Sequence, residues 1–493
     1  MKPGMSNKGM VILLALLSVT ILSGKAQSNL VFYHIHDQFN SSDYNPAFLT
    51  SQHNFTFSIF PLSGMNVGYN NQIVVNRMLK NILLGDTIEN VLNDKLDKFV
   101  EGGSFYQRFE SSLLHLGYNS EFGSFNFRIK EVEQIMSVVE GSFYEFIRNP
   151  EFLTPVINQP HSFPANAAYY REYSLGYAKE IIRNKLTVGF RAKLYFGKIS
   201  AIADVQGELV NDGDLSTLIT SGSMYLSAPV KLVQEDGFIT GAIQPENFSP
   251  VNFMLNSKNV GTGIDLGFNY KINHRLAVSA SAVDLFGKIS WKNNLNTLTY
   301  NGSVDVSGYV TSPDGIVTKN PGISSDDIEN ISDLFKIDHI DTISSYISSL
   351  PTTFYAGLKY QLNPKLAIGV VDRYISIKGM NHNSFSLTAG YIVNKKLSIS
   401  SGYSIIGNSY FNVPFGILYK WDLGQCYVGT DNFFSLLLPS ISDFSGITFG
   451  TCFYLFSRKS KYKKQLEYLP FFKEKKPRSA TKKGLIFNSY PDS

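Results

Sequence analysis

The stretch LGYAKEIIRNKL, residues 175–186, joins two runs of alternating apolar and polar residues through a short turn that contains Asn and Lys. The same phrase returns at residues 266–276, 356–366 and 389–397. Alternation with a period of two gives a β-strand one apolar and one polar face. Turns that contain Asn connect antiparallel strands, because Asn tolerates the backbone of a tight hairpin. The repeated phrase therefore predicts an antiparallel, all-β protein.

The length and composition of these strands favour a membrane barrel. Strands of about ten residues are long enough to cross a bilayer. A soluble β-sandwich shows the same alternation, because it buries its apolar face and solvates the other. Only 17% of the residues are charged and 14% are aromatic, which suits a barrel with aromatic belts at both membrane interfaces. From about sixteen candidate strands we predict a closed antiparallel transmembrane β-barrel of about fourteen strands, with its apolar residues turned toward lipid.

The chain divides into four segments. Residues 1–26 have the features of a signal peptide, since Lys2 and Lys8 precede the apolar run 11–22 and Gly24-Lys25-Ala26 fits a cleavage site. We expect residues 27–52 to form an irregular N-terminal plug or turn segment, residues 53–457 the barrel, and residues 458–493 a basic tail. A barrel exported behind a signal peptide is expected in the outer membrane.

Two short helical insertions are expected among the strands. The first covers residues 87–100, where apolar residues recur at helical spacing behind Thr87 as N-cap. The second runs from about Val138 to Asn149 and is ended by Pro150.

The basic tail is the segment most suited to a protein partner. Residues 458–493 contain eleven Lys and Arg against three Asp and Glu, whereas the whole chain has a net charge of +4. The tail either contacts an anionic surface, or a periplasmic or secretion-system protein, or it is a solvated end. Outer-membrane lipid is the other expected partner, and the composition does not indicate nucleic-acid binding.

The polar face of each strand is expected to line the lumen of the barrel. Alternation breaks at residues 281–284 and 371–373, and a β-bulge at each place would return the charged residues to the lumen. A charge on the lipid face would cost roughly 2–4 kcal/mol at mid-depth. The candidate lumen-lining residues are Arg191, Lys193, Asp265, Asn269, Lys271, Asp284, Lys359, Asp372 and Arg373.

Glycines recur on the same polar face of the predicted strands. Such glycines bend a strand, or leave room in a lumen for a plug or a path, and we expect bending. The set is Gly176, Gly189, Gly267, Gly357, Gly390, Gly402 and Gly416.

The sequence contains no pattern that indicates catalysis. A Gly-x-Ser-x-Gly elbow is absent and the eight His are scattered, so we expect no enzyme, no cofactor and no metal site. Cys426 and Cys452 lie equally far from residue 439, in the loop between the last two strands. A symmetric hairpin would make them neighbours, and their spacing leaves open whether they form a disulfide.

A family resemblance adds to this interpretation. The stretches YREYSLGY at 170–177 and LAVSASAVDLFGKISW at 276–291, with the early Asn45-Pro46-Ala47, resemble a family of uncharacterised Bacteroidota outer-membrane proteins, a domain of unknown function. More remotely, the chain is similar to fatty-acid transporters of the FadL type and to PorV-type barrels of type IX secretion. The resemblance implies a barrel with an N-terminal plug, for which Asn45, Pro46, Ala47 and Phe48 are the candidates.

Two functions remain open. The first is a FadL-like transporter or channel for small or hydrophobic solutes. The alternative is a non-transporting barrel that acts as a scaffold or partner-binding component of a type IX secretion or gliding-type machinery, through its basic tail. An apolar cavity that leads from the outer rim to a lateral gap would favour the fatty-acid-type path. A lumen closed by ion pairs would count against it.

Overall fold

The structure is a computed structural model that describes residues 30–35, 38–49, 55–71, 103–139, 161–212, 215–235, 237–305, 309–311, 317–319, 337–377, 380–407, 409–437 and 444–455. The predicted signal peptide, the predicted helix at 87–100 and the predicted basic tail lie outside these residues. Of the second predicted helix, Val138 and Val139 belong instead to a strand, and the remainder lies outside the described residues.

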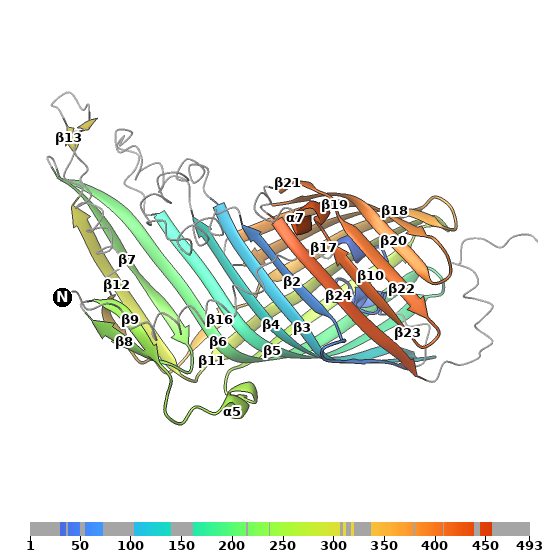
Figure 1. Ribbon diagram of the computed structural model, residues 1–493, viewed down its shortest axis with the longest axis horizontal. Coiled ribbons are helices and arrows are strands. Elements are labelled where there is room, and N and C mark those ends of the chain that lie inside the picture. Colours follow the sequence, from blue (N-terminus) through green and yellow to red (C-terminus); the bar gives the residue numbers. More distant parts are fainter. Residues whose placement is uncertain are drawn as a thin grey trace, which may run out of the picture. The chain divides into compact units, whose positions relative to one another are not determined.

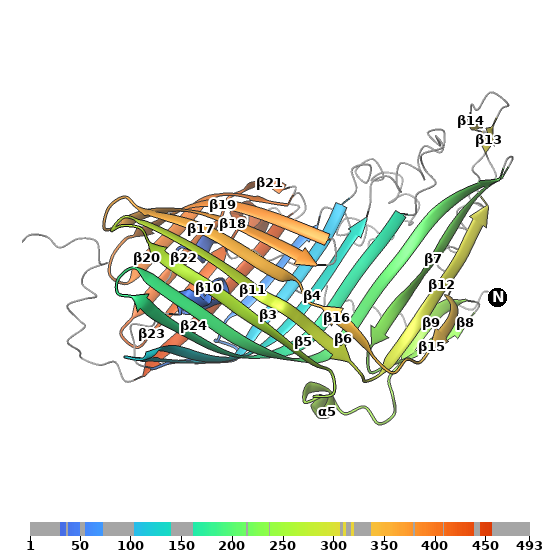
Figure 2. The same ribbon diagram turned by 180° about the vertical axis from the view of Figure 1, so that it is seen from behind.

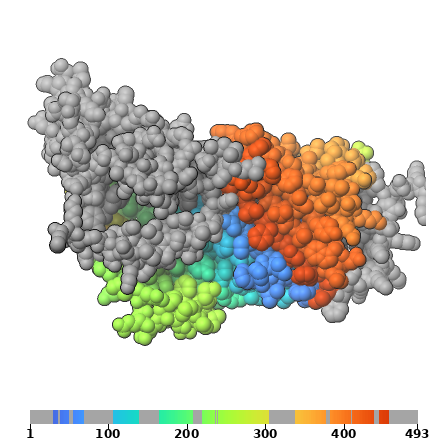
Figure 3. Space-filling view, viewed as in Figure 1, coloured from blue at the N-terminus to red at the C-terminus, as the bar shows by residue number. Residues whose placement is uncertain are grey.

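Fourteen strand positions, each antiparallel to its neighbours, form a closed β-barrel, and the predicted fold is confirmed. Figures 1 and 2 show the barrel from two sides. The ring closes where β24 pairs with both β1 and β2, which share one position beside β3. In a space-filling view the blue N-terminal strands lie directly beside the orange-red C-terminal ones (Figure 3). In ring order the strands are β1 (Phe55–Ile59) with β2 (Met65–Asn71), β3 (Gly103–Ser120), β4 (Gly123–Val139), β5 (His161–Ile182), β6 (Leu186–Asp212), β10 (Val260–Lys271), β11 (Leu276–Trp291), β17 (Thr352–Gln361), β18 (Leu366–Ile377), β19 (Met380–Ile392), β20 (Leu397–Ile406), β22 (Phe415–Trp421), β23 (Gly424–Thr430) and β24 (Phe444–Leu455).

The apolar residues of the barrel face outward. On neighbouring strands, 42% of Val188, 43% of Leu266 and 41% of Phe268 is exposed, whereas Arg191 and Asp265 on the opposite face are buried. A soluble sandwich would show the reverse arrangement, because it buries its apolar face. The exposed apolar rows are those of a wall that faces hydrocarbon, as the alternation predicted.

Part of the sheet continues beyond the ring. Strand β6 is 27 residues long; its residues 186–196 pair with β10, and its residues 200–212 pair with β7 (Leu215–Ser227). The sheet then continues through β12 (Leu295–Asp305) to β15 (Ile337–Asp341), while β16 (Tyr346–Ser349) pairs with the end of β11. Figure 2 shows this extension as the strands that leave the barrel together.

Asn259 lies where β6 changes partner. Its backbone carbonyl accepts the N–H of Gly197, and its side-chain Oδ1 accepts the N–H groups of Lys292 and Asn293 at 2.8 and 3.1 Å. One buried side chain thus joins β6, the start of β10 and the turn after β11. The described parts of residues 228–259 and 309–351 add no strand to the ring.

The remaining elements are short. They are the hairpins β8 (Lys231–Glu235) with β9 (Phe238–Ile243) and β13 (Tyr309–Thr311) with β14 (Val317–Lys319), the strand β21 (Ser409–Asn412), and the helices α5 (Pro250–Met254) and α7 (Phe433–Leu437). None of the helices in the described residues is long and apolar enough to cross a membrane.

The N-terminal segment, defined as residues 30–35 and 38–49, lies inside the ring (Figure 1). It consists of three 3-10 turns, η1 (Leu30–Phe32), η2 (Ser41–Asp43) and η3 (Pro46–Phe48). Its apolar side chains form the largest buried cluster together with inward-facing residues of β18, β22 and β23, namely Val371, Leu418 and Tyr427. The lumen at this level is therefore filled by the chain itself.

The two cysteines are on neighbouring strands but are not bonded. Gln425 pairs with Cys452, and Cys426 pairs with Thr451, so the two cysteines are one residue out of register and point to opposite faces of the sheet. The hairpin is not symmetric about residue 439, so a disulfide is excluded and only the expected proximity is confirmed.

Candidate functional site

The tetrapeptide Asn45-Pro46-Ala47-Phe48 is buried and forms the turn η3. Asn45 is its N-cap: Oδ1 accepts the N–H of Ala47 at 2.9 Å, and Pro46 occupies the first helical position, where its missing N–H is harmless. The amide nitrogen of Asn45 donates to the carbonyl oxygens of Phe268 and Ala280 at 3.0 and 3.1 Å. One side chain therefore caps the turn and fastens it to β10 and β11.

The beginning of the N-terminal segment is fastened to the opposite wall. The carboxylate of Asp431, directly after β23, accepts the N–H groups of Leu30 and Val31 at 3.2 and 2.9 Å. Ser400 Oγ on β20 donates to the carbonyl of Val31 at 3.1 Å. Sequence analysis missed Asp431, because a lone Asp in a loop carries no periodic signal.

His34 completes this attachment on β17 and β18. Its Nε2 donates to the carbonyl of Val370 at 3.0 Å, and Lys359 Nζ donates to the carbonyl of His34 at 2.7 Å. Burial, with the nearby positive charge of Lys359, lowers the pKa of His34 to about 3. His34 is therefore neutral while the segment is in place.

Glycines of the wall are close to the N-terminal segment. A Cβ added to Gly189 or Gly267 would come within 3.0 Å of Pro46 or Asn45. A Cβ at Gly357 would meet Tyr33, and one at Gly369 would meet His34. A Cβ added to Gly416 or Gly429 would meet the ring of Phe32. At these positions glycine leaves room for the N-terminal segment. The expectation that the glycines bend the strands does not describe their main role here.

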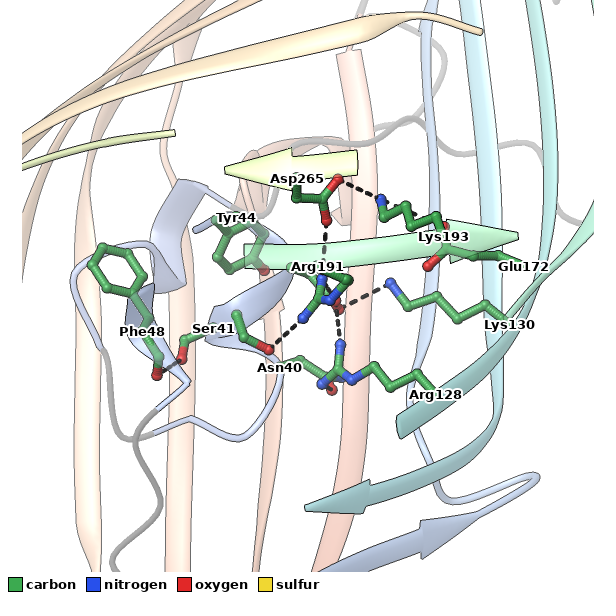
Figure 4. A network of polar contacts seen from close by, with 12 residues as sticks. Asn40, Ser41, Tyr44, Phe48, Arg128, Lys130, Glu172, Arg191, Lys193 and Asp265 are labelled. Atoms are coloured by element: carbon green, nitrogen blue, oxygen red, sulfur yellow. Dashed lines mark hydrogen bonds and ion pairs between the residues drawn. The ribbon is translucent and has the colours of Figure 1, made fainter. Parts of the chain in front are cut away.

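Asp43 joins the N-terminal segment to the charged wall of the lumen. Figure 4 shows the basic side chains of that wall, Arg128, Lys130 and Arg191, pointing toward one another beside the N-terminal segment. The Asp43 carboxylate pairs with Arg128 and Lys130 of β4 and Arg191 of β6, at 3.0 Å for Lys130 and 3.3 Å for Arg191. Only 18% of the Asp43 side chain is exposed. Burial raises the pKa of Asp43, but the three positive charges outweigh burial and hold the pKa well below its ordinary value.

The ion pairs continue along the wall away from Asp43. Arg191 and Lys193 both reach Asp265, at 3.4 and 2.9 Å. Lys193 also lies 2.6 Å from an oxygen of Asp284 and 3.5 Å from one of Glu172. The connected set comprises Arg108, Arg128, Lys130, Arg191, Lys193, Asp43, Glu110, Glu172, Asp265 and Asp284.

Most predicted lumen residues are placed inside. Asn269 and Arg373 are buried, Lys271 is half-buried near the end of β10, and Arg373 donates to Ser384 Oγ at 3.1 Å. Asp284 is returned to the lumen as predicted: the β10–β11 register shifts beside it, and it has a φ of 57°.

The prediction for Asp372 is wrong. The register of β18 runs without a shift from residue 366 to residue 377, so Asp372 lies on the outward face with Val370 and Tyr374. Val371 faces inward and packs against the N-terminal segment.

A small polar cavity lies between the N-terminal segment and the wall. Its volume is about 60 Å³, and Asn40, Asp43 and Tyr44 contribute to its lining. The remaining lining residues come from strands around the ring and include Arg108, Glu110, Lys130, Glu172, Arg191, Lys193, Asp284 and Arg373. Such a volume corresponds to about four to six water positions. The cavity is too small and too polar to be an open hydrophobic path.

Arg108, Glu110, Arg128, Lys130 and Glu172 were not among the predicted lumen residues. They alternate on β3, β4 and β5, so the same period of two that identified Arg191 could have found them. Among the described residues, no group of three or more His, Cys, Asp and Glu side chains has the geometry of a metal site.

Comparison with known proteins identifies the family. A model described as a family of unknown function, DUF5723, matches residues 46–431, which is most of the chain. The chain belongs to this family. No curated protein matches this DUF5723 chain.

Several solved transporters and channels are similar to this DUF5723 protein. The toluene transporter TodX of P. putida is 12% identical over 87% of this chain and 94% of TodX, with a TM-score of 0.36. The toluene transporter TbuX of Ralstonia pickettii is 10% identical over 83% of this chain and 91% of TbuX, with a TM-score of 0.36. A FadL homologue of Pseudomonas aeruginosa is 10% identical over 84% of this chain and 92% of its own, with a TM-score of 0.34. Values this low carry no argument about a substrate.

Proposed function

We propose that this protein is an outer-membrane channel whose lumen is closed by its N-terminal segment, acting as a plug, and that it passes small polar solutes when the plug moves. The outward apolar rows support a place in a membrane, and the filled lumen supports a closed resting state. We propose a transport role without catalysis, in which the barrel is the passage and the plug is the gate.

The observation that carries this proposal is the set of ion pairs centred on Asp43. These pairs connect the plug to β4 and β6 and continue across the wall to β10 and β11. Hydrophobic solutes would have to cross buried charges here, which is unfavourable because charges attract water and exclude apolar groups. Small polar solutes can replace that water. The geometry thus favours the polar alternative over a fatty-acid-type path.

Conductance measures this function directly. Full-length protein in a planar bilayer is expected to remain mostly closed, and a variant without residues 30–49 is expected to conduct steadily. A variant without residues 458–493 is the control, because it removes a longer segment from the other end of the chain and should leave the closed state unchanged. Equal conductance of full-length protein and the variant without the plug would refute a gate at this place.

The scaffold alternative has one observation in its favour. Side chains or backbone groups of eight strands, β4, β6, β10, β11, β17, β18, β20 and β23, hold the plug, so the resting lumen is closed. A permanently closed barrel would act through its surface or its tail. Two results together would favour the scaffold. Deletion of residues 458–493 would remove a partner from pull-downs and leave solute uptake intact, and the variant without the plug would show no conductance.

A further inference from the structure

We propose that the polar cavity beside the plug binds a small oxyanion, of the size of a carboxylate or a phosphate, which is the class of solute that the channel passes. This inference rests on the proposed channel function and names its substrate class. It is carried by the charge of the cavity lining, by one buried amide without a partner, and by the size of the space.

The lining of the cavity has more basic than acidic side chains. Five bases line it, namely Arg108, Lys130, Arg191, Lys193 and Arg373, against four acids, namely Asp43, Glu110, Glu172 and Asp284. Each of the five bases is at most 8% exposed. Two further buried charges pair with lining residues without lining the cavity, Asp265 with Arg191 and Lys193, and Arg128 with Asp43. With these included, the described charged residues around the cavity are six bases and five acids. A buried excess of positive charge is costly, because charges in a medium of low dielectric lose their hydration. A single bound anion would balance this lining, whereas a bound cation would add to the excess.

Asn66 supplies an uncharged hydrogen-bonding group aimed into the same space. It lies on β2 opposite Thr448 of β24, and both residues line the cavity. The side chain is 7% exposed, and neither its Nδ2 nor its Oδ1 has a hydrogen-bond partner. Buried amides are nearly always paired, so an unpaired one indicates a missing ligand or water. Its two N–H donors suit an oxygen of an anion.

The wall has few backbone hydrogen bonds on the β3 side of Asn66, although β2 pairs with β24 from residue 65 to residue 70. Ser112 N–H donates to the carbonyl of Gly64, and the next β2–β3 pair is Asn71 with Phe105. The intervening residues of both strands are described, and their ladder contains no further pair. The backbone between these two points is thus not committed to the β2–β3 ladder where it borders the cavity.

The volume limits the ligand. A space of about 60 Å³ replaces about four to six waters, so it suits an anion of a few heavy atoms and excludes a long acyl chain. Tyr44, Tyr106 and Tyr355 also line the cavity, and a tyrosine hydroxyl can donate to an oxygen of the same anion.

Titration of purified full-length protein in detergent tests the inference. Sodium acetate and sodium phosphate are the two probes, and methylammonium chloride is the cationic control. We expect at least one of the two anions to bind with a dissociation constant of about 1 mM or tighter, and methylammonium not to bind. Acetate alone would indicate a carboxylate solute, and phosphate alone a phosphate. Absence of binding by both anions, or binding by methylammonium alone, would overturn the proposal.

Two substitutions assign the binding to this cavity. Asn66→Asp places a negative charge in the lining and is expected to weaken anion binding by about tenfold or more, which is about 1.4 kcal/mol. Asn126→Asp is the matched control, because Asn126 is 2% exposed and its amide also lacks a partner, yet it does not line the cavity. Asn126→Asp is expected to leave binding within about twofold. Equal weakening by both substitutions would refute a site at Asn66.

Folding and transport failures can be separated from failure of this inference. If Asn66→Asp does not yield a folded barrel, Asn66→Leu removes the amide at nearly the same size without adding charge and should weaken binding by about tenfold or more. Unchanged binding in Asn66→Leu would overturn the proposal. A channel that opens on removal of the plug but binds neither anion would sink the oxyanion site while leaving the channel function intact.

Discussion

Replacing Asp43 with Asn tests whether charge holds the plug in place. Asp43→Asn keeps the size of the side chain but removes the carboxylate that pairs with Arg128, Lys130 and Arg191. Lys130 retains Glu110 at 3.8 Å, and Arg191 retains Asp265 at 3.4 Å. Arg128, which is 1% exposed, would keep only neutral hydrogen-bond acceptors among the partners seen in the structure.

The expected effect is large because one buried base loses its counterion. Breaking a buried ion pair by removing one partner costs about 3–5 kcal/mol. The lower end applies here, since two of the three bases retain another acid. Water reaches these bases once the plug moves, so the cost falls mainly on the closed state. A change of about 3 kcal/mol raises the ratio of open to closed channels about a hundredfold.

Single-channel recording in planar bilayers measures that ratio. Glu110→Gln is the matched control: it removes an acid from the same set of ion pairs, but Glu110 pairs with Arg108 and Lys130 of the wall and not with the plug. We expect Asp43→Asn to open the channel far more often than Glu110→Gln, although both lower barrel stability. Equal open probabilities for the two variants would show that the Asp43 pairs stabilise the wall and do not gate it.

Three further outcomes are expected. Gly369→Val should displace the plug and raise conductance, because even a Cβ there would overlap the His34 ring. Gly390→Val should leave conductance unchanged, because nothing lies within 4 Å of a Cβ at that position. Comparable conductance from both variants would contradict the close packing at Gly369. The plug should become easier to cleave by protease as the pH falls from 6.5 toward 3, because the docked segment is favoured only while the His34 ring is neutral. The free energy that holds the plug in place falls by about 2 kcal/mol at pH 5. The pH profile should flatten in His34→Gln, and an unchanged profile would assign the effect to another group. Denatured protein should take up two equivalents of maleimide with or without reductant, because Cys426 and Cys452 point to opposite faces; no uptake before reduction would mean that they are bonded.

The ring could be predicted from the sequence because alternation is a local property of each strand. Arg191, Lys193 and Asp265 were assigned to the lumen from the period of two alone, and the structure buries all three. The lengths of the long strands and the extension beyond the ring could not be predicted. They depend on where β6 changes its partner from β10 to β7, and the tertiary contacts of Asn259 found at that place carry no periodic signal in the sequence.

The error at Asp372 has a physical cause. Sequence analysis assumed that charged residues of a strand face the lumen, so the adjacent Asp372 and Arg373 suggested a bulge. The lumen is occupied at that level by an apolar segment, and an inward Val371 is favourable there. The polarity of an inward position follows from what fills the barrel, which strand patterning does not reveal. The sequence left the disulfide open for a similar reason, because a one-residue change of register across a loop reverses the face of a side chain.

The glycines show why the plug and its wall are best considered as one structure. Gly369 lies against the plug, Gly402 lies against the backbone of Leu387 and Thr388, and Gly390 faces open space, although all three occur in similar strand patterns. The plug itself is attached in two ways. Its first turn is held by apolar packing, by close contact of Phe32 with two glycines and by hydrogen bonds to Asp431 and Ser400. Its second turn is held mainly by the ion pairs of Asp43, which water or an anion can replace. Movement of the plug is therefore expected to begin at η2, with η1 still anchored to the wall.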